Sequence, residues 1–107
     1  MGSACVMVMT TVATEQQAEE LARGLVEAGL AACVQIEPIR SVYRWKGEVC
    51  AEAEFRLTAK TTEQRYTELE AHIKAHHAYE TPEIVMVPIA GGSREYLAWV
   101  DECTRGG

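Results

Sequence analysis

The 107-residue sequence has no cluster of lysine or arginine: its ten basic residues are scattered among sixteen acidic ones, for a formal net charge of −6. Proteins that bind nucleic-acid phosphates concentrate positive charge, so we expect no nucleic-acid partner. No apolar run approaches the roughly 18 residues that span a bilayer. The apolar N-terminal stretch also lacks the basic flank of a signal peptide, so we expect a cytoplasmic protein with no membrane partner.

The signatures of zinc fingers and of common enzymes are also absent. The four cysteines, at positions 5, 33, 50 and 103, lack the paired spacing of a structural zinc site. Cys5, Cys33 and Cys103 lie in apolar patterns and are expected to be core thiols. There is no glycine-rich phosphate loop and no recognisable nucleophile motif. We therefore predict that the protein is not an enzyme, and we assign no catalytic residue.

The patterns that are present predict one domain over residues 1–107, of which residues 1–3 are expected to be disordered or a remnant of cloning. The β-rich run 5–12 predicts a strand buried on both faces. Thr14 and Gln17 have the spacing of a capping box. Apolar residues then recur at helical intervals up to a glycine, which is a typical helix stop.

A long hairpin is predicted next. Residues 32–45 have the composition of one strand and residues 48–60 that of another, and the two-residue turn Lys46-Gly47 joins them. The second strand alternates strictly between apolar and polar side chains, which is the period of a β-strand. Pro38 interrupts the first strand and therefore predicts an edge position or a bulge.

A second helix, a strand and a last helix complete the chain. Thr61 opens another Thr-x-x-Gln pattern, which predicts the start of a helix that ends near His76. A strand is predicted over 83–89, at a sheet edge because Pro88 lies within it. The last helix is expected to begin after Ser93 and to bury an apolar stripe. The members of this stripe are Tyr96, Trp99, Val100 and Cys103.

The order β-α-β-β-α-β-α predicts an α/β (α+β) fold. It is a ferredoxin-like βαββαβ sandwich with helices on one face of an antiparallel sheet, an extra C-terminal helix and a long hairpin between the second and third strands. Strands of about thirteen residues are longer than usual, and a small sheet does not cover such a hairpin. Its distal part would expose Tyr43 and Trp45, and exposed aromatic patches mark interfaces. We therefore expect an oligomer.

The segment His76–Glu83, with the sequence HHAYETPE, places metal-binding and proton-binding groups on one short loop, where functional sites are often built. The paired imidazoles are candidate metal ligands, and Tyr79, Glu80 and Glu83 are candidate pocket residues. Simpler interpretations remain open: one histidine caps the preceding helix while the other is solvated, and the acidic side chains are solvated. A third histidine, His72, lies four residues before the pair, a spacing that also permits chelation.

Five motifs fall in the order and spacing of one known family, and the sequence resembles the CutA family, the divalent-cation tolerance proteins, from about residue 5 to 103. The motifs are LAAC at 30–33, YRWKGEV at 43–49, KTT at 60–62, HHAYETPEI at 76–84 and YLAW at 96–99. The resemblance implies a ferredoxin-like fold and a homotrimer with strands shared between subunits, similar to P-II signalling trimers. It also implies a cytoplasmic role in tolerance to copper and other divalent metals, without an established enzyme activity.

The resemblance implies site residues as well. A copper site of the family uses two consecutive histidines, which match His76 and His77. Its third ligand is a cysteine at the end of the first strand, where this sequence departs from the family with Thr10. A hydroxyl is a poor ligand for soft copper(I), so the departure bears on copper affinity. The residues expected at the trimer interface are Tyr43, Trp45 and Trp99.

Two functional hypotheses follow. The first is a homotrimeric protein that binds copper or another divalent cation through His76 and His77 and takes part in metal tolerance. The alternative is a P-II-like trimeric regulatory module that binds a small anion or metabolite in clefts between subunits, beside the loop that carries Tyr79, Glu80 and Glu83. A stable scaffold without any ligand is a third interpretation.

Overall fold

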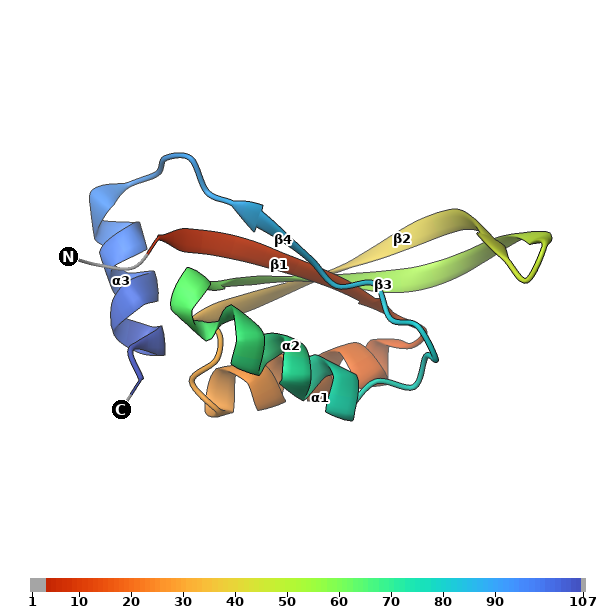
Figure 1. Ribbon diagram of the computed structural model, residues 1–107, viewed down its shortest axis with the longest axis horizontal. Coiled ribbons are helices and arrows are strands. Elements are labelled where there is room, and N and C mark those ends of the chain that lie inside the picture. The colour runs from red at the N-terminus through yellow and green to blue at the C-terminus, as the bar shows by residue number, and fades with distance from the viewer. Residues whose placement is uncertain (1–3, 107) are drawn as a thin grey trace.

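The computed structural model describes residues 4–106, so the expectation for residues 1–3 lies outside the described part of the chain. Helices α1 and α2 cover one face of an antiparallel sheet, and α3 lies at one end of it (Figure 1). The elements are β1 (Cys5–Val12), α1 (Glu15–Glu27), β2 (Cys33–Trp45), β3 (Glu48–Thr62), α2 (Tyr66–Ala75), β4 (Val85–Pro88) and α3 (Arg94–Thr104). The predicted α+β class and element order are confirmed. Within the described range, no helix has the length and apolar character needed to cross a membrane.

The strand order is β2-β3-β1-β4, and every neighbouring pair is antiparallel. The inner strand β1 pairs with β3 along its full length, from Cys5 opposite Thr62 to Val12 opposite Phe55. The β2–β3 hairpin joins two β-α-β units, β1-α1-β2 and β3-α2-β4. The sheet therefore has the ferredoxin-like arrangement that the sequence predicts.

The core lies between the sheet and the two covering helices. Leu25 of α1, Leu57 of β3, and Leu69 and Ile73 of α2 are all less than 2% exposed. Complete burial of such a side chain contributes about 1.5–3 kcal/mol. These contacts fix how α1 and α2 sit on the sheet, and thus where the loop that follows α2 emerges.

One of the two predicted capping boxes is present. The Thr14 hydroxyl accepts a hydrogen bond from the Gln17 backbone N–H, and the Gln17 side chain accepts one from the Thr14 N–H. The box at Thr61 is wrong, because Thr61 belongs to β3 and its buried hydroxyl donates to the Leu30 carbonyl oxygen at 2.7 Å. Helix α2 consequently begins only at Tyr66, after a short 3-10 turn.

Both prolines within strands lie on edge strands, as predicted. Pro38 is in β2 and Pro88 is in β4, the two outer strands of the sheet. Strand β4 is shorter than the predicted range 83–89 because it pairs only with Val6–Met9 of β1. Neither outer strand presents an unbroken row of backbone N–H groups, since proline has none.

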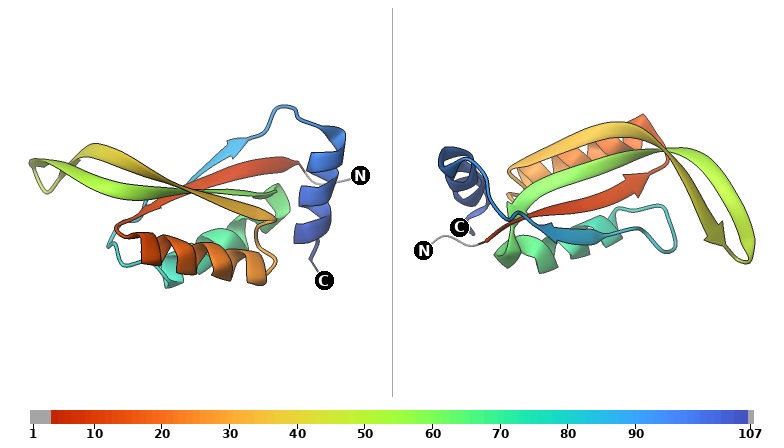
Figure 2. Two further views of the ribbon diagram at one scale, coloured as in Figure 1. Left: turned by 180° about the vertical axis from the view of Figure 1, so that it is seen from behind. Right: turned by 90° about the horizontal axis from the view of Figure 1, so that it is seen from above.

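The β2–β3 hairpin extends beyond the helical layer (Figures 1 and 2). Its turn residues Lys46 and Gly47 have φ angles of 49° and 83°, and positive φ at both positions matches the twist of a two-residue hairpin. The radius of gyration is 14.4 Å, against about 13 Å for a compact chain of similar length. Val42 and Val49 are 73% and 68% exposed and Trp45 is 39% exposed, so a single chain leaves the distal hairpin largely uncovered.

Helix α3 buries less of its apolar stripe than expected. Val100 and Thr104, one helical turn apart, are its buried residues. The expectation that Cys103 is a core thiol is wrong, because α3 lies at the end of the sheet and only a narrow side of it is covered. Cys5 is buried and Cys33 is half-buried, both as free thiols.

Candidate functional site

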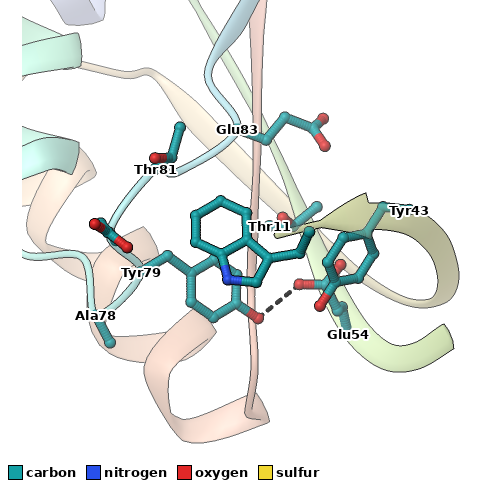
Figure 3. A pocket seen from close by; sticks show the side chains of 9 residues that line it. Thr11, Tyr43, Glu54, Ala78, Tyr79, Thr81 and Glu83 are labelled. Carbon is teal, nitrogen blue, oxygen red and sulfur yellow. Dashed lines mark hydrogen bonds between the residues drawn. The ribbon is translucent and has the colours of Figure 1, made fainter. Parts of the chain in front are cut away.

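The loop between α2 and β4 forms one wall of a pocket of about 450 Å³ beside the hairpin (Figure 3). Its lining residues are Thr11, Tyr43, Trp45, Glu54, Ala78, Tyr79, Glu80, Thr81 and Glu83. Thr11 pairs with Arg56 across β1 and β3, so it shares a sheet face with Glu54. The neighbouring Leu57 points to the opposite face, into the core under the helices. The pocket therefore lies on the face that α1 and α2 leave open.

Glu54 is the buried carboxylate of this pocket, with 7% of its surface exposed. The Tyr79 hydroxyl donates a hydrogen bond of 2.6 Å to Glu54 Oε2 (Figure 3). Burial, and then this hydrogen bond, raise the pKa of Tyr79 well above its ordinary value, so the phenol remains a donor at neutral pH. None of the ion pairs found in residues 4–106 includes Glu54.

The sequence groups Glu54 with Glu48 and Glu52 on one face of a strand, as candidate ligands of a hard cation or, more simply, as a solvated or arginine-paired row; it does not predict that Glu54 is buried. The alternation of β3 correctly places it on the polar face with Glu48 and Glu52, a pattern that indicates a solvated row of carboxylates. Its burial comes from the loop that carries Tyr79, 25 residues away along the chain. No pattern within β3 indicates that this loop covers Glu54.

The hairpin supplies the other aromatic groups of the pocket. The Tyr43 hydroxyl donates to the Glu52 carboxylate, and this hydrogen bond, with burial second, raises the pKa of Tyr43 to about 12. Trp45 lies two residues further along the same strand face. The Lys46 ammonium nitrogen is 5.7 Å from the centroid of the Trp45 ring, within the range of a cation–π contact.

The pocket has a single sign of charge. Glu80 and Glu83 are exposed carboxylates at its rim, Glu54 is the buried one, and its lining includes no lysine, arginine or histidine. All three predicted pocket residues, Tyr79 among them, line this one space within a single chain. Carboxylates at close range repel anions and attract cations, so the charge of the pocket opposes the anionic ligand of the alternative hypothesis.

His77 anchors the loop to the sheet. Its Nε2 lies 2.7 Å from the Thr11 carbonyl oxygen, and the Tyr79 backbone N–H donates to its Nδ1 at 3.0 Å. Because a carbonyl only accepts, these bonds assign the proton to Nε2. Both ring nitrogens are therefore engaged, and a metal would have to displace one hydrogen bond to reach His77.

His76 faces a different part of the molecule. As the C-terminal residue that caps α2, it donates from Nδ1 to the His72 carbonyl oxygen at 2.8 Å. This assigns the lone pair to Nε2, which makes no hydrogen bond among residues 4–106. Its ring stacks on that of His72 with centroids 4.2 Å apart. The two rings line a second, smaller pocket between α2 and α1, with Glu20 and Gly24 on the α1 side.

The structure thus separates the two adjacent histidines. His76 bonds within α2, whereas His77 bonds to β1. Thr10 pairs with Leu57, is 1% exposed, and its hydroxyl has no hydrogen-bond partner among residues 4–106. Over the same range, no group of three or more His, Cys, Asp or Glu side chains converges as a metal site would.

The residues expected at the trimer interface form two patches. Tyr43 and Trp45 lie on the hairpin, whereas Trp99 lies on α3 at the opposite end of the molecule (Figure 1). Trp99 is 43% exposed and packs against Tyr96, with ring centroids 5.6 Å apart. Both patches expose aromatic surface.

Comparison with known proteins identifies the family. The sequence model of one protein family, the CutA1 divalent ion tolerance proteins, matches residues 6–103. The chain belongs to the CutA1 family. The divalent-cation tolerance protein CutA of Thermus thermophilus is 48% identical over 99 residues, which cover 92% of this chain and 96% of that protein. The protein of the same name from Archaeoglobus fulgidus is 41% identical over 92 residues, 86% and 90% of the respective chains.

Solved CutA1 structures share the fold. CutA1 from Oryza sativa superposes with a TM-score of 0.95 at 39% identity, covering 99% of this chain and 98% of that one. The PII-like protein CutA from Nostoc sp. PCC 7120 gives 0.88 at 37% identity, with 94% and 97% covered. The resemblance drawn from the five sequence motifs is therefore confirmed.

Proposed function

We propose that this CutA1 protein is a cytoplasmic homotrimer that binds copper or another divalent cation. In this proposal it takes part in metal tolerance and does not catalyse a reaction. Its membership of the divalent ion tolerance family supports the cation class. The net charge of −6 favours cations over anions near the surface. Imidazole nitrogens are suitable ligands for copper, zinc and nickel.

The free lone pair of His76 carries the proposal. Metal-binding histidines usually donate the other ring N–H to a carbonyl or carboxylate, which fixes the tautomer and orients the ring. His76 has this arrangement, since its Nδ1–H is held by the His72 carbonyl oxygen. Burial, with the neighbouring His76 as a second cause, lowers the pKa of His72, and the neutral imidazole is the form that binds metal.

We therefore assign the first ligands to His72, on the last turn of α2, and His76, the residue that caps it; their stacked rings would have to turn apart to bind one ion. Glu20 of α1 lines the same pocket, but no third His, Cys, Asp or Glu of residues 4–106 converges with the two rings, so water would complete the donor set. His77 takes a different role in this proposal: it holds the loop on β1 through the Thr11 carbonyl. The lack of a thiol at Thr10 then matters little, because the site does not involve the end of β1.

Calorimetric titration with copper(II) and zinc(II) tests this assignment. Parent protein is compared with His72→Ala, His76→Ala and His77→Gln, each checked for fold by circular dichroism. We expect loss of either proposed ligand to weaken binding roughly tenfold or more, and His77→Gln to bind like the parent. Equal affinity of parent and His76→Ala would refute the site, and loss of binding in His77→Gln alone would return the ligand role to His77.

The trimer is part of the proposal. Large apolar side chains on the distal hairpin and on α3 are exposed in the single chain, and contiguous apolar surface of this kind marks protein interfaces. Three hairpins that cover one another would remove this surface from water. The elongated outline of the chain, 47 × 25 × 21 Å, fits a subunit that reaches across a neighbour.

A second candidate function has its own support. A related chain of known structure is described as a PII-like protein, and the pocket of about 450 Å³ has a volume typical of small-molecule sites. This CutA1 protein would then be a regulatory module that responds to a metabolite. A thermal-shift screen of metabolites separates the two candidates, since a response to metals alone would reject this one.

A further inference from the structure

We propose that the distal part of the β2–β3 hairpin, residues 39–54, joins subunits through two complementary faces, so that one face binds the opposite face of the hairpin of a second copy of this chain. In this contact Arg40 and Arg44 of one subunit lie against the buried carboxylate of Glu54 in the next subunit. The contact rests on the trimer of the proposed function and specifies what each subunit contributes to its neighbour. It does not involve the histidine metal site.

The register of β2 and β3 divides the distal hairpin into two faces. Residues directly opposite each other in an antiparallel pair lie on the same face, and the next pair lies on the other face. The members of the first face, here called the pocket face, include Tyr43, Trp45, Glu48, Glu52 and Glu54. The members of the second, here called the arginine face, are Arg40, Val42, Arg44, Val49, Ala51 and Ala53. One face is thus aromatic and acidic, and the other is apolar and basic.

The arginine face has no covering layer among residues 4–106. It continues the side of the sheet that packs under α1 and α2, where Leu57 is buried and Phe55 packs against the core. Beyond Phe55 the hairpin extends past both helices (Figures 1 and 2), and its side chains there are exposed. Val42 and Val49, at 73% and 68%, are the most exposed large apolar side chains of this face. Exposed apolar surface of this kind marks an interface.

The two arginines of this face lack a carboxylate partner. Neither Arg40 nor Arg44 takes part in an ion pair within the described part of the chain. Arg44 donates a hydrogen bond of 3.4 Å to the Gly47 carbonyl oxygen, which leaves most of its N–H groups without a protein acceptor. Guanidinium groups are suited to carboxylates at protein interfaces. The partner of this face should therefore carry both apolar surface and negative charge.

The pocket face has the opposite requirement. Glu54 is 7% exposed and accepts a hydrogen bond from Tyr79, but it is in none of the ion pairs of residues 4–106. Arg56, the next residue of β3 on the same side of the sheet, is paired with Glu37 at 3.0 Å. A carboxylate removed from water without an opposite charge destabilises its surroundings. Glu54 therefore requires a cation from outside the chain.

The surroundings of Glu54 match the arginine face in both respects. Glu80 and Glu83 lie at the rim of the same pocket (Figure 3), and neither is in an ion pair over the described range. Tyr43 and Trp45 supply apolar surface beside them. Two arginines flanked by valines thus complement three carboxylates flanked by aromatic rings, and Tyr43 and Trp45 become buried in the contact.

A second copy of the chain is the partner that satisfies both faces. Arg44 and Glu54 of one chain lie on opposite faces of the ribbon, so they cannot pair with each other. A contact between two different surfaces of identical chains is heterologous, and it generates a ring when the rotation closes. In a ring of three chains, every pocket face meets an arginine face.

Carbodiimide crosslinking tests the contact directly. The variant Arg40→Lys/Arg44→Lys keeps both positive charges and introduces amines that couple only to adjacent carboxylates. Equal amounts of ¹⁴N-labelled and ¹⁵N-labelled chains are mixed in urea and refolded together. We expect mass spectrometry to find position 40 or 44 joined to Glu54, Glu80 or Glu83 in peptides of mixed isotope, which arise only between subunits.

A matched control uses an ion pair within one helix. Arg23 is paired with Glu19 of α1 at 3.1 Å, so Arg23→Lys should give a crosslink of single isotope. If this control couples while positions 40 and 44 couple to no carboxylate of the pocket, or couple only within one chain, the contact is refuted.

A double-mutant cycle measures the strength of the pairing. Parent, Arg40→Gln/Arg44→Gln, Glu54→Gln and the triple variant are compared by sedimentation, at the urea concentration that half dissociates the parent trimer. We expect the arginine change to weaken association about tenfold or more in the parent and clearly less in the Glu54→Gln background. Equal effects in the two backgrounds would overturn the pairing. Should Glu54→Gln unfold, the crosslinking result decides.

The same measurements separate this contact from the proposed function. A monomeric parent would refute both the trimer and the contact. A trimeric parent without crosslinks between subunits at positions 40 and 44 would refute the contact alone and leave the pocket to the second candidate function. Metal titration of the His76 variants is independent of either result.

Discussion

The imidazole of His72 is sensitive to pH through its position between two helices. Burial, and then the neighbouring His76, lower its pKa from the ordinary value, which is about 6.5 in an unfolded chain. The unfolded chain therefore binds this proton more readily than the folded one. The free energy of unfolding should decrease as the pH falls through about 6.5, and should be unaffected by this group at higher pH.

Urea unfolding between pH 5 and 8 measures this effect. The difference in stability between the parent and His72→Gln isolates it, because the other two histidines are present in both proteins. We expect the parent to lose stability relative to the variant as the pH is lowered. A difference that does not change with pH, or that changes in the opposite direction, would contradict the proposed burial of the neutral ring.

At the scale of helices, Gly24 explains how α1 accommodates α2. Glycine inside a helix destabilises it by roughly 0.5–1 kcal/mol relative to alanine, yet Gly24 lies in the middle of α1. A Cβ at this position would lie 3.2 Å from His72 Nε2, closer than ordinary contacts. The absent side chain leaves room for the His72 ring between the two helices.

The variant Gly24→Ala should therefore gain little or no stability in the parent, because displacement of His72 offsets the better helix propensity. In a His72→Ala background the same change should stabilise by about 0.5–1 kcal/mol. Urea unfolding of the four proteins gives the coupling energy directly. Identical effects in both backgrounds would show that the ring and the glycine do not interact. We also expect Gly24→Ala to weaken metal binding at His72 and His76.

Much of the architecture was predictable because its causes are local. The Thr14 capping box, the Lys46-Gly47 turn and the prolines of the edge strands all depend on neighbouring residues, and all appear in the structure. The wrong predictions concern residues whose contacts are distant in the sequence. Thr61 bonds to Leu30, 31 residues away, so its local cap pattern is misleading.

The sequence predicted which residues belong to the candidate site, but it did not predict which atoms they contact. The spacing of adjacent residues on a helix, about 100° apart, already implies that His76 and His77 point in different directions. Which atoms they contact depends on tertiary structure, since His77 bonds to Thr11, 66 residues away. The burial of Glu54 under the Tyr79 loop has the same origin, and no pattern within one strand encodes it.

At the scale of the molecule, the exposed hairpin predicts that the chains associate, and the resemblance to the CutA family implies that they do so as trimers. Size-exclusion chromatography with light scattering should give three times the chain mass at micromolar concentration. The double variant Val42→Glu/Val49→Glu places charge on side chains that are 73% and 68% exposed in one chain, and should dissociate the trimer if the hairpin is covered by neighbours. Val26→Glu, at a 43% exposed position on α1, is the control and should remain trimeric. A monomeric parent would refute the assembly.

The prolines of β2 and β4 have a consequence for uncontrolled association. A sheet with free outer strands invites copies to add end on end, as in fibrils. Pro38 and Pro88 each remove a backbone donor from one outer strand, so a docking strand cannot form a continuous ladder on either side. Any assembly of these chains should consequently stop at a finite size, and prolonged incubation at high concentration should yield no thioflavin-positive fibres.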